Sequence, residues 1–424
     1  MDGPFAMSRR RALLAAAAAL PAIALPGVAW ATKPLPSQIL SYRLQNGHYS
    51  SAGGWGRTFS SQYQLESPPN RVRLIWFNDT TGPITIDAAA VAPTSGPHDG
   101  MVPLDADGAA APGLWRPVTF ADAAPGQPHG PLTIQADPVS DGQPSVAVSD
   151  WIDVAGMARR DGGAGAFLLV RSYSRGLLRF SPDGPPDVAV GQAYRAGWSD
   201  GNGAAPPYAL ASVHPDPSLH ACYGLQYVAG VPGISVIGIG DSIMQSLRTT
   251  HSVSGFGVRA CAMLSTPQRP VSYFNEGYSG RKSVDFATDG LRDLALLRPQ
   301  VALIQAWSEN DSWTRAAADA SLDLARRVVD ATRQVGGAPI LVTAAPVFRN
   351  KPAAEVFRRR SNDAVRAMAG PSLPVLDLDA IWGTGSDPNA YRTQYDSGEA
   401  THPNDAAAVA AATALSLVLQ KIIA

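Results

Sequence analysis

The stretch Ile234-Ser235-Val236-Ile237-Gly238-Ile239-Gly240-Asp241-Ser242 decides the fold. Its first six residues are almost all apolar, as in a strand that is buried on both faces of a parallel sheet. Shorter runs of the same kind follow at 271–274, 301–304, 339–342 and 374–376, and segments with helical periodicity lie at 316–335, 353–369 and 403–423. Strands that alternate with helices predict a parallel sheet with helices on both faces over residues 231–424.

Residues 34–227 have a different sequence pattern. Short β-rich runs at 60–65, 71–77, 84–86, 132–134, 145–148 and 166–170 are separated by clusters of Gly, Pro, Asn and Asp. Many short strands with turns between them are typical of a sandwich or jelly roll. We therefore predict an all-β domain at 34–227 in front of the α/β domain.

Length and charge limit the kind of protein. A chain of 424 residues is expected to form two domains, and 45% hydrophobic residues are enough for both to have cores. The 34 basic residues are dispersed among 35 acidic ones, for a net charge of −1. A protein that tracks phosphates needs a basic face, so we expect no nucleic-acid partner.

The first 31 residues are predicted to be an export signal rather than part of the fold. Three arginines at 9–11 precede an Ala- and Leu-rich stretch, and residues 29–31 fit a small-x-small cleavage site. Residues 8–10 are similar to a twin-arginine signal. The alternative is a retained anchor, but two prolines interrupt the apolar stretch. We expect the mature chain, from Thr32, to be periplasmic or secreted and to have no later membrane span.

The two cysteines, Cys222 and Cys261, allow two interpretations. An exported protein can form a disulfide, and closing so long a loop would stabilise the fold by about 4 kcal/mol. Two buried free thiols are the alternative; we favour the disulfide. No Cys/His cluster has the spacing of a zinc site, so we expect no metal site.

Residues with reactive side chains follow the predicted strands. Gly240-Asp241-Ser242 comes after the first strand, 275–280 after the second and 307–311 after the third, while His402 precedes the last helix. Since ligands bind at the carboxyl ends of parallel strands, we expect these segments to meet. A serine hydroxyl needs a base to take its proton, and imidazole is suited to that role near neutral pH. The sequence therefore predicts Ser242 as a nucleophile and His402 as its base.

Two carboxylates are candidates for orienting this base. Glu399 lies three residues before it, where a tight loop can fold the carboxylate back onto the ring, and Asp396 is the competing candidate. A backbone carbonyl in place of either acid is a third possibility. For a tetrahedral oxyanion, the backbone N–H groups of Ser242 and Gly280 and the side-chain amide of Asn310 can supply three donors.

These blocks resemble the SGNH, or GDSL-type, hydrolase family. The family has Gly-Asp-Ser after the first strand, a glycine after the second, Gly-x-Asn-Asp after the third and Asp-x-x-His before the last helix. Residues 240–242, 275–280, 310–311 and 402–403 match these blocks in that order. The resemblance covers roughly residues 231–424 and implies a flavodoxin-like three-layer α/β/α fold and a serine esterase that needs no cofactor. Some carbohydrate esterases of this class also carry a β-rich domain in front.

The chain departs from the family pattern at two positions. Ser308 stands in place of the glycine of the third block, which is expected to reshape the loop and to leave Asn310 in place. Glu399 stands in place of the aspartate of the fourth block and is one methylene longer. Trp307 and Trp313 flank Asn310 and suit either a sugar or acyl subsite or core packing.

Each site residue also has a structural interpretation. Ser242 could cap the helix that follows it, and Asp241 is expected to satisfy backbone donors in its turn. Asn310 and Asp311 could simply form a turn, and His402 before a proline could mark a helix entry. Four such coincidences in the family order are far less probable than any one of them, which favours the catalytic interpretation.

The combination predicts hydrolysis of O-acyl esters on a small-molecule or polysaccharide substrate, through an acyl-enzyme. The expected export and the preceding β-rich domain favour O-acetyl groups on carbohydrate. An exported lipase or arylesterase and a polysaccharide O-acetyltransferase would use the same residues, so the fold does not decide among them. A non-catalytic glycan-binding protein on a degenerate hydrolase scaffold is the alternative from another class.

Overall fold

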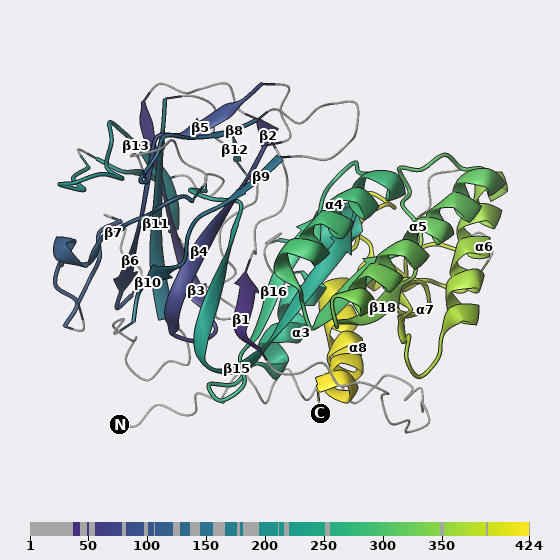
Figure 1. Cartoon of the computed structure of the whole chain (residues 1–424). Coiled ribbons are helices and arrows are strands. Elements are labelled where there is room, and N and C mark those ends of the chain that lie inside the picture. The colour runs from purple at the N-terminus through teal and green to yellow at the C-terminus, as the bar shows by residue number, and fades with distance from the viewer. Residues whose placement is uncertain are drawn as a thin grey trace, which may run out of the picture.

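The computed structural model describes residues 37–42, 49–50, 56–78, 82–96, 101–105, 107–121, 128–135, 145–155, 166–175, 179–180, 195–210, 212–215, 220–250, 255–347, 352–386 and 389–423. The predicted export signal at 1–31 lies outside these residues. Figure 1 shows a strand-rich N-terminal region beside a region in which strands alternate with helices. This arrangement confirms a β-rich part in front of an α/β part.

Short antiparallel strands make up the N-terminal region, as its turn-rich sequence predicted. They are β1 (Ser37–Tyr42), β2 (Tyr49–Ser50), β3 (Arg57–Leu65), β4 (Pro69–Asn78), β5 (Ile84–Ile86), β6 (Ala88–Thr94), β7 (Arg116–Pro117), β8 (Leu132–Ile134), β9 (Ser145–Val148), β10 (Ile152–Asp153), β11 (Ala166–Ser174), β12 (Arg179–Phe180), β13 (Arg195–Asp200) and β14 (His214–Pro215). Six of them form one sheet in the order β14-β13-β3-β11-β6-β7. Apolar side chains of β3 and β11 share a buried core with those of β4, for example Tyr63, Leu168 and Trp76.

One long strand, β15 (Gly224–Gly240), runs through both parts of the molecule. Its first half pairs antiparallel with β1 and β4. Its second half, from Ile234, pairs parallel with β16 (Val271–Gly277) and β17 (Val301–Gln305). The stretch 228–230, which separates the two predicted domains, therefore lies inside a strand. The boundaries at 227 and 231 stay predictions, but the two parts are joined by continuous backbone pairing.

The parallel part of the sheet has the order β16-β15-β17-β18-β19, which is 2-1-3-4-5 in chain order and typical of a flavodoxin-like sheet. Its further strands are β16 (Val271–Gly277), β17 (Val301–Gln305), β18 (Ala338–Val342) and β19 (Val375–Leu376). Its helices are α2 (Ser242–Gln245), α3 (Phe256–Leu264), α4 (Ser283–Leu297), α5 (Arg315–Gln334), α6 (Pro352–Met368), α7 (Leu378–Trp382) and α8 (Asp405–Ile423). The predicted α/β fold is confirmed.

The helices cover the sheet in two layers. Helices α4, α5 and α6 bury residues such as Phe286, Val329 and Val365 against one set of strand side chains. Helices α3, α7 and α8 bury residues such as Phe256 and Leu415 in the other core. The sheet is therefore apolar on both faces, which is why its strands are continuous apolar runs rather than alternating ones.

Helix α8 corrects one expectation. Among the described residues it is the one helix whose length and composition would allow it to cross a membrane, with a mean hydropathy of 1.8, whereas no such segment was expected after residue 31. Ala407, Ala411, Leu415 and Leu419 on one of its faces are buried in the shared core. A core helix of a folded domain meets the same criterion, so α8 is explained by packing.

The cysteines correct a second expectation. The structure has Cys222 and Cys261 as two free, buried thiols instead of the disulfide that was favoured. Cys222 lies 3.8 Å from the hydroxyl of Tyr63 in the β-rich part, whereas Cys261 belongs to α3. Burial raises the pKa of the Cys222 thiol to about 12, so this thiol is poorly nucleophilic.

Candidate active site

Ser242 is the first residue of α2, and only Asp241 separates it from the carboxyl end of β15. The side chain of Asp241 caps this helix by accepting from the N–H of Ile243 at 2.9 Å, so the cap is Asp241 and the Ser242 hydroxyl is not used for it. A Cβ on Gly277 would lie 2.2 Å from the backbone nitrogen of Gln245. Glycine there allows the end of β16 to pack directly against α2 and so fixes the turn that carries Ser242.

His402 contacts Ser242 and one of the two candidate acids, Glu399. Its Nε2 lies 3.0 Å from Ser242 Oγ, and its Nδ1 lies 3.0 Å from Glu399 Oε2. Ser242 is 2% exposed and His402 8% exposed. The fold thus brings together a hydroxyl, an imidazole and a carboxylate in one hydrogen-bonded line, across 160 residues of sequence.

The competing carboxylate, Asp396, binds backbone N–H groups of its own loop instead of the imidazole. Its Oδ1 accepts from the N–H groups of Gly398 at 2.8 Å and Ala400 at 3.2 Å, which folds the loop in front of His402. The structure therefore places Glu399, rather than Asp396, against the imidazole.

Arg248 is a neighbour of the site that sequence reasoning missed. Its Nε lies 2.6 Å from Glu399 Oε1, while the other carboxylate oxygen faces His402. The side chain of Glu399 is 36% exposed and that of Arg248 58% exposed. Arg248 follows α2 in the left-handed region, at φ 72°, and nothing in its local sequence marks it as a partner of a residue 151 positions away.

Asp241, the residue before Ser242, is enclosed by the protein. It is fully buried, its Oδ2 accepts from the hydroxyl of Ser308 at 2.6 Å, and its backbone N–H donates to Gln305 Oε1 at 3.2 Å. Burial raises the pKa of this carboxyl, while the hydrogen bonds from Ser308 and Ile243 act against the rise. Asp241 supports the turn in front of Ser242, as expected for this residue.

Two of the three predicted oxyanion donors, Gly280 and Asn310, lie on two adjoining loops, while the third, the N–H of Ser242, belongs to the first residue of α2. Gly280 has a φ of +83°, in the left-handed region that favours glycine, and it precedes Arg281. The Asn310 side-chain amide donates to the carbonyl of Arg281 and to the hydroxyl of Ser308, both at 3.1 Å. The loop after β17 is therefore tied directly to the residue that follows Gly280.

Asp311 holds these loops from the other side. Its Oδ1 accepts from the N–H of Ser283 at 3.0 Å, and its Oδ2 accepts from the Ser283 hydroxyl and from the N–H of Ser308 at 3.2 Å. Because Ser283 begins α4, Asp311 links the third block to the start of that helix. Its role in the structure is to position the loop.

Trp307 and Trp313 form an edge-to-face pair with ring centroids 5.0 Å apart. Trp307 is 1% exposed, which favours core packing over a subsite for this residue. Trp313 is partly exposed and donates its indole N–H to the carbonyl of Glu309 at 3.1 Å.

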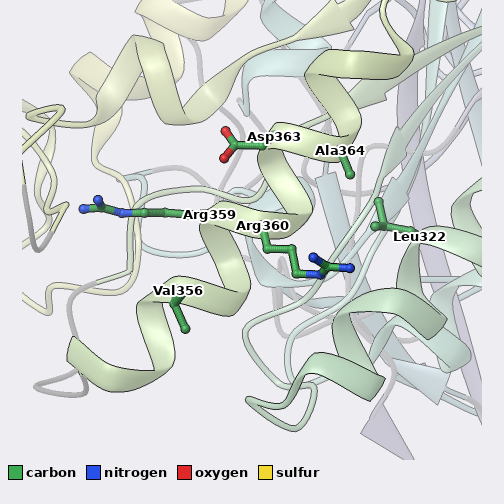
Figure 2. A pocket seen from close by; sticks show the side chains of 6 residues that line it. All are labelled: Leu322, Val356, Arg359, Arg360, Asp363 and Ala364. Atoms are coloured by element: carbon green, nitrogen blue, oxygen red, sulfur yellow. The ribbon is translucent and has the colours of Figure 1, made fainter.

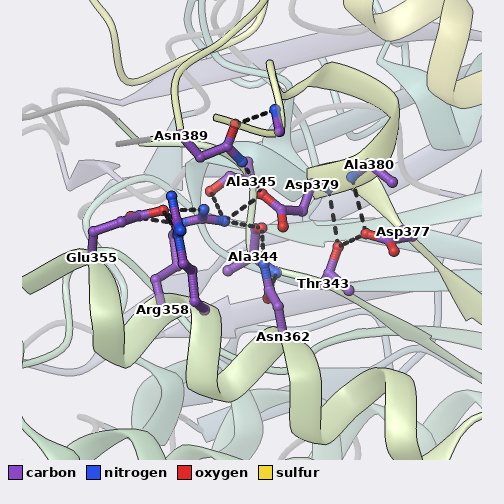
Figure 3. A network of polar contacts seen from close by, with 12 residues as sticks. Thr343, Ala344, Ala345, Glu355, Arg358, Asn362, Asp377, Asp379, Ala380 and Asn389 are labelled. Atoms are coloured by element: carbon purple, nitrogen blue, oxygen red, sulfur yellow. Dashed lines mark hydrogen bonds and ion pairs between the residues drawn. The ribbon is translucent and has the colours of Figure 1, made fainter. Parts of the chain in front are cut away.

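The loop after β18 is fixed by side chains of α6, as Figure 3 shows. Arg358 is fully buried and donates to the carbonyls of Ala344 at 3.1 Å and Ala345 at 3.2 Å. Asn362 accepts from the N–H of Ala344 and donates to its carbonyl. The carboxyl end of the strand next to β17 is thereby held rigidly.

The charge of Arg358 is balanced by Glu355 and by Asp379, which lies 2.7 Å away. Burial alone would raise the pKa of Asp379, but the positive charges of Arg358 and Arg366 outweigh it and keep this pKa below its ordinary value. A buried arginine with two carboxylates and two carbonyls satisfies the requirement that buried charges be paired.

An open groove of about 600 Å³ lies between α5 and α6. It is lined by Leu322, Val356, Arg359, Arg360, Asp363 and Ala364. Figure 2 shows Arg360 reaching toward Leu322 while Arg359 points to the other side, and none of the predicted site residues lines this groove. Within the part of the chain that the structure describes, no group of His, Cys, Asp and Glu side chains is arranged to hold a metal ion.

Among solved structures, the chain is similar to a two-domain esterase active on acetylated mannans, with 22% identity and a TM-score of 0.34, covering 45% of this chain and 50% of that one. It is also similar to a family 3 carbohydrate esterase from Clostridium thermocellum (14% identity, TM-score 0.34, 45% and 97% covered). A third is a GDSL-like lipase from Bacteroides thetaiotaomicron (16% identity, TM-score 0.32, 44% and 86% covered). No curated protein matches the chain.

The family comparison covers the part of the chain that holds the site. Residues 239–409 match the model of the GDSL-like Lipase/Acylhydrolase family, and this range contains Ser242, Gly280, Asn310, Glu399 and His402. The chain therefore carries, at residues 239–409, a domain of the GDSL-like lipase/acylhydrolase family, which makes it a carboxylic ester hydrolase.

Proposed function

We propose that the chain hydrolyses O-acyl esters through an acyl-enzyme on Ser242, with His402 as base and Glu399 as the acid that orients it. The observation that carries this proposal is the line of two 3.0 Å contacts from Ser242 Oγ through the His402 ring to Glu399. A nucleophile in contact with a base that is itself oriented by a carboxylate is the arrangement that activates a serine.

In the first half-reaction, Ser242 Oγ attacks the ester carbonyl carbon and its proton passes to His402 Nε2. The carbonyl electron pair moves onto oxygen, where the N–H groups of Ser242 and Gly280 and the amide of Asn310 are the proposed donors. The tetrahedral intermediate expels the alkoxide, which takes the proton from His402. Water then repeats the sequence on the acyl group and restores the free hydroxyl.

Glu399 has two tasks in this mechanism. By accepting from Nδ1–H it holds the tautomer of His402 in which Nε2 is free to accept the serine proton. Its negative charge also stabilises the imidazolium that forms in the transition state. Because its side chain is 36% exposed and contacts Arg248, water and the arginine partly screen this negative charge.

The preferred substrate in this proposal is an O-acetyl ester on carbohydrate. A strand-rich region that shares a sheet with the catalytic part, through β15, supports a two-part enzyme acting on a polymer. Export by the signal at 1–31 belongs to the same proposal, since a polysaccharide substrate lies outside the cytoplasm. Detection of a mature N-terminus at Thr32 in the periplasm or medium of an expressing bacterium tests it.

The direct test is ester hydrolysis by the chain from Thr32 on chromogenic esters of increasing acyl length. We expect acetate to turn over fastest and Ser242→Ala to lose the activity. Acetate release from acetylated polysaccharide, measured with and without an added sugar acceptor, then separates hydrolysis from transfer. If Ser242→Ala hydrolyses esters as fast as the unchanged chain, the proposed mechanism is wrong.

A further inference from the structure

Ser308 lies where three loops of the site meet. It follows β17, is fully buried, and replaces the glycine that the family pattern has at this position. Its hydroxyl lies 2.6 Å from Asp241 Oδ2 and 2.8 Å from the carbonyl of Arg281. It also accepts from the backbone N–H and the side-chain amide of Asn310, both at 3.1 Å. One oxygen atom thus connects the residue before Ser242, the residue after Gly280 and Asn310.

The hydrogen-bonding capacity of the Ser308 hydroxyl explains how one side chain holds these three loops together. Ser308 has one proton and two lone pairs, so it donates to either Asp241 or the Arg281 carbonyl at a given moment. If Asp241 is ionised, Ser308 donates to it, and the carbonyl keeps its bond from Asn310. In this state the two lone pairs of Ser308 accept from the backbone N–H and the side-chain amide of Asn310. Each of these buried polar groups then has a partner, which an alanine at 308 could not provide.

The two amide hydrogens of Asn310 are both engaged, one by Ser308 and one by Arg281. Donation to an oxyanion requires that one of them turn away. The bond to Ser308 is the one that can be released without moving the loop, because the backbone N–H of Asn310 still holds the same oxygen.

We propose that Ser308 is a positioning residue for ester hydrolysis. Its hydroxyl binds Asn310 and the carbonyl of Arg281, the residue after Gly280. Because the same hydroxyl also binds Asp241, it keeps these groups at a fixed distance from Ser242. This inference rests on the proposed function, in which Gly280 and Asn310 stabilise the oxyanion. Ser308 does not touch the reacting atoms; it acts through the donors it holds. Removal of the hydroxyl should therefore weaken binding of the tetrahedral state and leave binding of the planar ester almost unchanged.

The expected size follows from the cost of a lost donor. Deleting one oxyanion donor lowers kcat by about 10²–10³-fold, and donors that are displaced rather than deleted should cost less, about 10- to 100-fold. KM should change by about threefold or less, since the ground-state ester makes few of these contacts.

The experiment compares Ser308→Ala and Ser308→Gly with the unchanged chain. It measures kcat and KM on an acetate ester and the affinity for methylboronic acid, which forms a tetrahedral adduct with a reactive serine. The glycine variant restores the residue of the family pattern and serves if the alanine variant does not fold. We expect kcat and boronate affinity to fall by the same factor in each variant.

Thr343→Val is the matched control. Thr343 is also fully buried after a neighbouring strand, and its hydroxyl donates to Asp377 at 3.1 Å and accepts from the N–H of Asp379 at 3.2 Å. It should lower the melting temperature to a similar extent while kcat stays within about twofold of the unchanged chain.

The outcomes separate the two claims. Folded Ser308 variants with unchanged kcat and unchanged boronate affinity would overturn the positioning role, even if Ser242→Ala is inactive. Equal losses of kcat in Thr343→Val and Ser308→Ala would also overturn it, because they would point to general loss of stability. Hydrolysis that survives Ser242→Ala would overturn the proposed function, and this inference with it.

Discussion

Two carboxylates flank the Ser242–His402 pair in opposite surroundings. Asp241, on the inner side, is fully buried and accepts hydrogen bonds from Ser308 and from the backbone of Ile243. Glu399, on the outer side, has a side chain that is 36% exposed and faces an arginine that is 58% exposed. The inner carboxylate fixes the backbone turn that carries Ser242, the proposed nucleophile, whereas the outer one contacts the imidazole of the proposed base.

The difference shows where the site can tolerate change. A charge interaction in a low-dielectric interior is several times stronger than the same interaction at the surface, where water and salt screen it. A lost contact on the inner side also leaves a buried polar group without a partner, but water can replace a lost contact on the outer side. We therefore expect effects on catalysis to decrease from the Ser242–His402 contact toward Arg248.

The largest effect is expected at the contact that joins the two sides. Replacing His402 by alanine removes the base for Ser242 and should lower kcat by about 10⁴-fold or more on acetate esters. Circular dichroism should show an unchanged fold. A folded variant that keeps even a tenth of the activity would contradict the role of His402.

Glu399→Gln should have the next largest effect. A glutamine can present its N–H to the imidazole and favour the wrong tautomer, yet solvent at this exposed position can partly replace the carboxylate. We expect a loss in kcat of about 10²-fold. Asp396→Asn is the comparison variant: it should weaken the loop by about 1 kcal/mol, seen in urea unfolding, with a much smaller loss in kcat. The reverse ranking of the two variants would make Asp396 the triad acid.

A third carboxylate, Glu66, is partly exposed and lies outside the site, and it also has an altered pKa. Burial raises the pKa of Glu66 to about 7 from 4.5, against a hydrogen bond that Tyr227 donates at 2.7 Å. Because the folded pKa is the higher one, the contribution of Glu66 to stability is present below about pH 4.5 and is lost as the pH rises through about 7.

The variant Glu66→Gln should remove this loss. At about pH 8 it should be more stable than the unchanged chain by about 2 kcal/mol in urea unfolding, while at about pH 4 the two should be alike. Equal differences at both pH values would mean that Glu66 does not titrate differently in the folded state.

Arg248→Ala should have the smallest effect on catalysis. An exposed ion pair contributes about 0.2–1 kcal/mol, so we expect kcat to fall by about 1.4-fold to fivefold at low ionic strength, with less difference at high salt. Arg326→Ala is the matched control, since Arg326 pairs with Asp323 at the same 2.6 Å and is 54% exposed, outside the site. If Arg248→Ala loses as much activity as Glu399→Gln at any salt concentration, the exposed ion pair between Arg248 and Glu399 contributes more to catalysis than this account allows.

The apolar runs predicted the parallel strands because a strand covered by helices on both faces is apolar throughout. They did not predict that β15 begins at Gly224, since Gly230-Val231-Pro232-Gly233 looks like a linker in sequence. The strand β6 was also missed, because its Ala-rich sequence has little β propensity and is instead set by burial between neighbouring strands. Tertiary pairing decides both cases.

The order of the four blocks predicted which residues would meet, and the structure places Ser242, His402 and Glu399 in contact. The two supporting residues could not be predicted in the same way. Ser308 was expected only to reshape a loop, and its contacts with Asp241 and Arg281 depend on how the loops after β15, β16 and β17 converge. Arg248 reaches Glu399 from a left-handed turn that has no local signature.

Labelling of the chain with a fluorophosphonate, followed by peptide mass analysis, tests the central claim most directly. The reagent phosphonylates a serine hydroxyl only where a base activates it. We predict one modified peptide that carries the label on Ser242, and no label after His402→Ala. A label on another serine, or labelling of Ser242 that is equally fast in His402→Ala, would contradict the account.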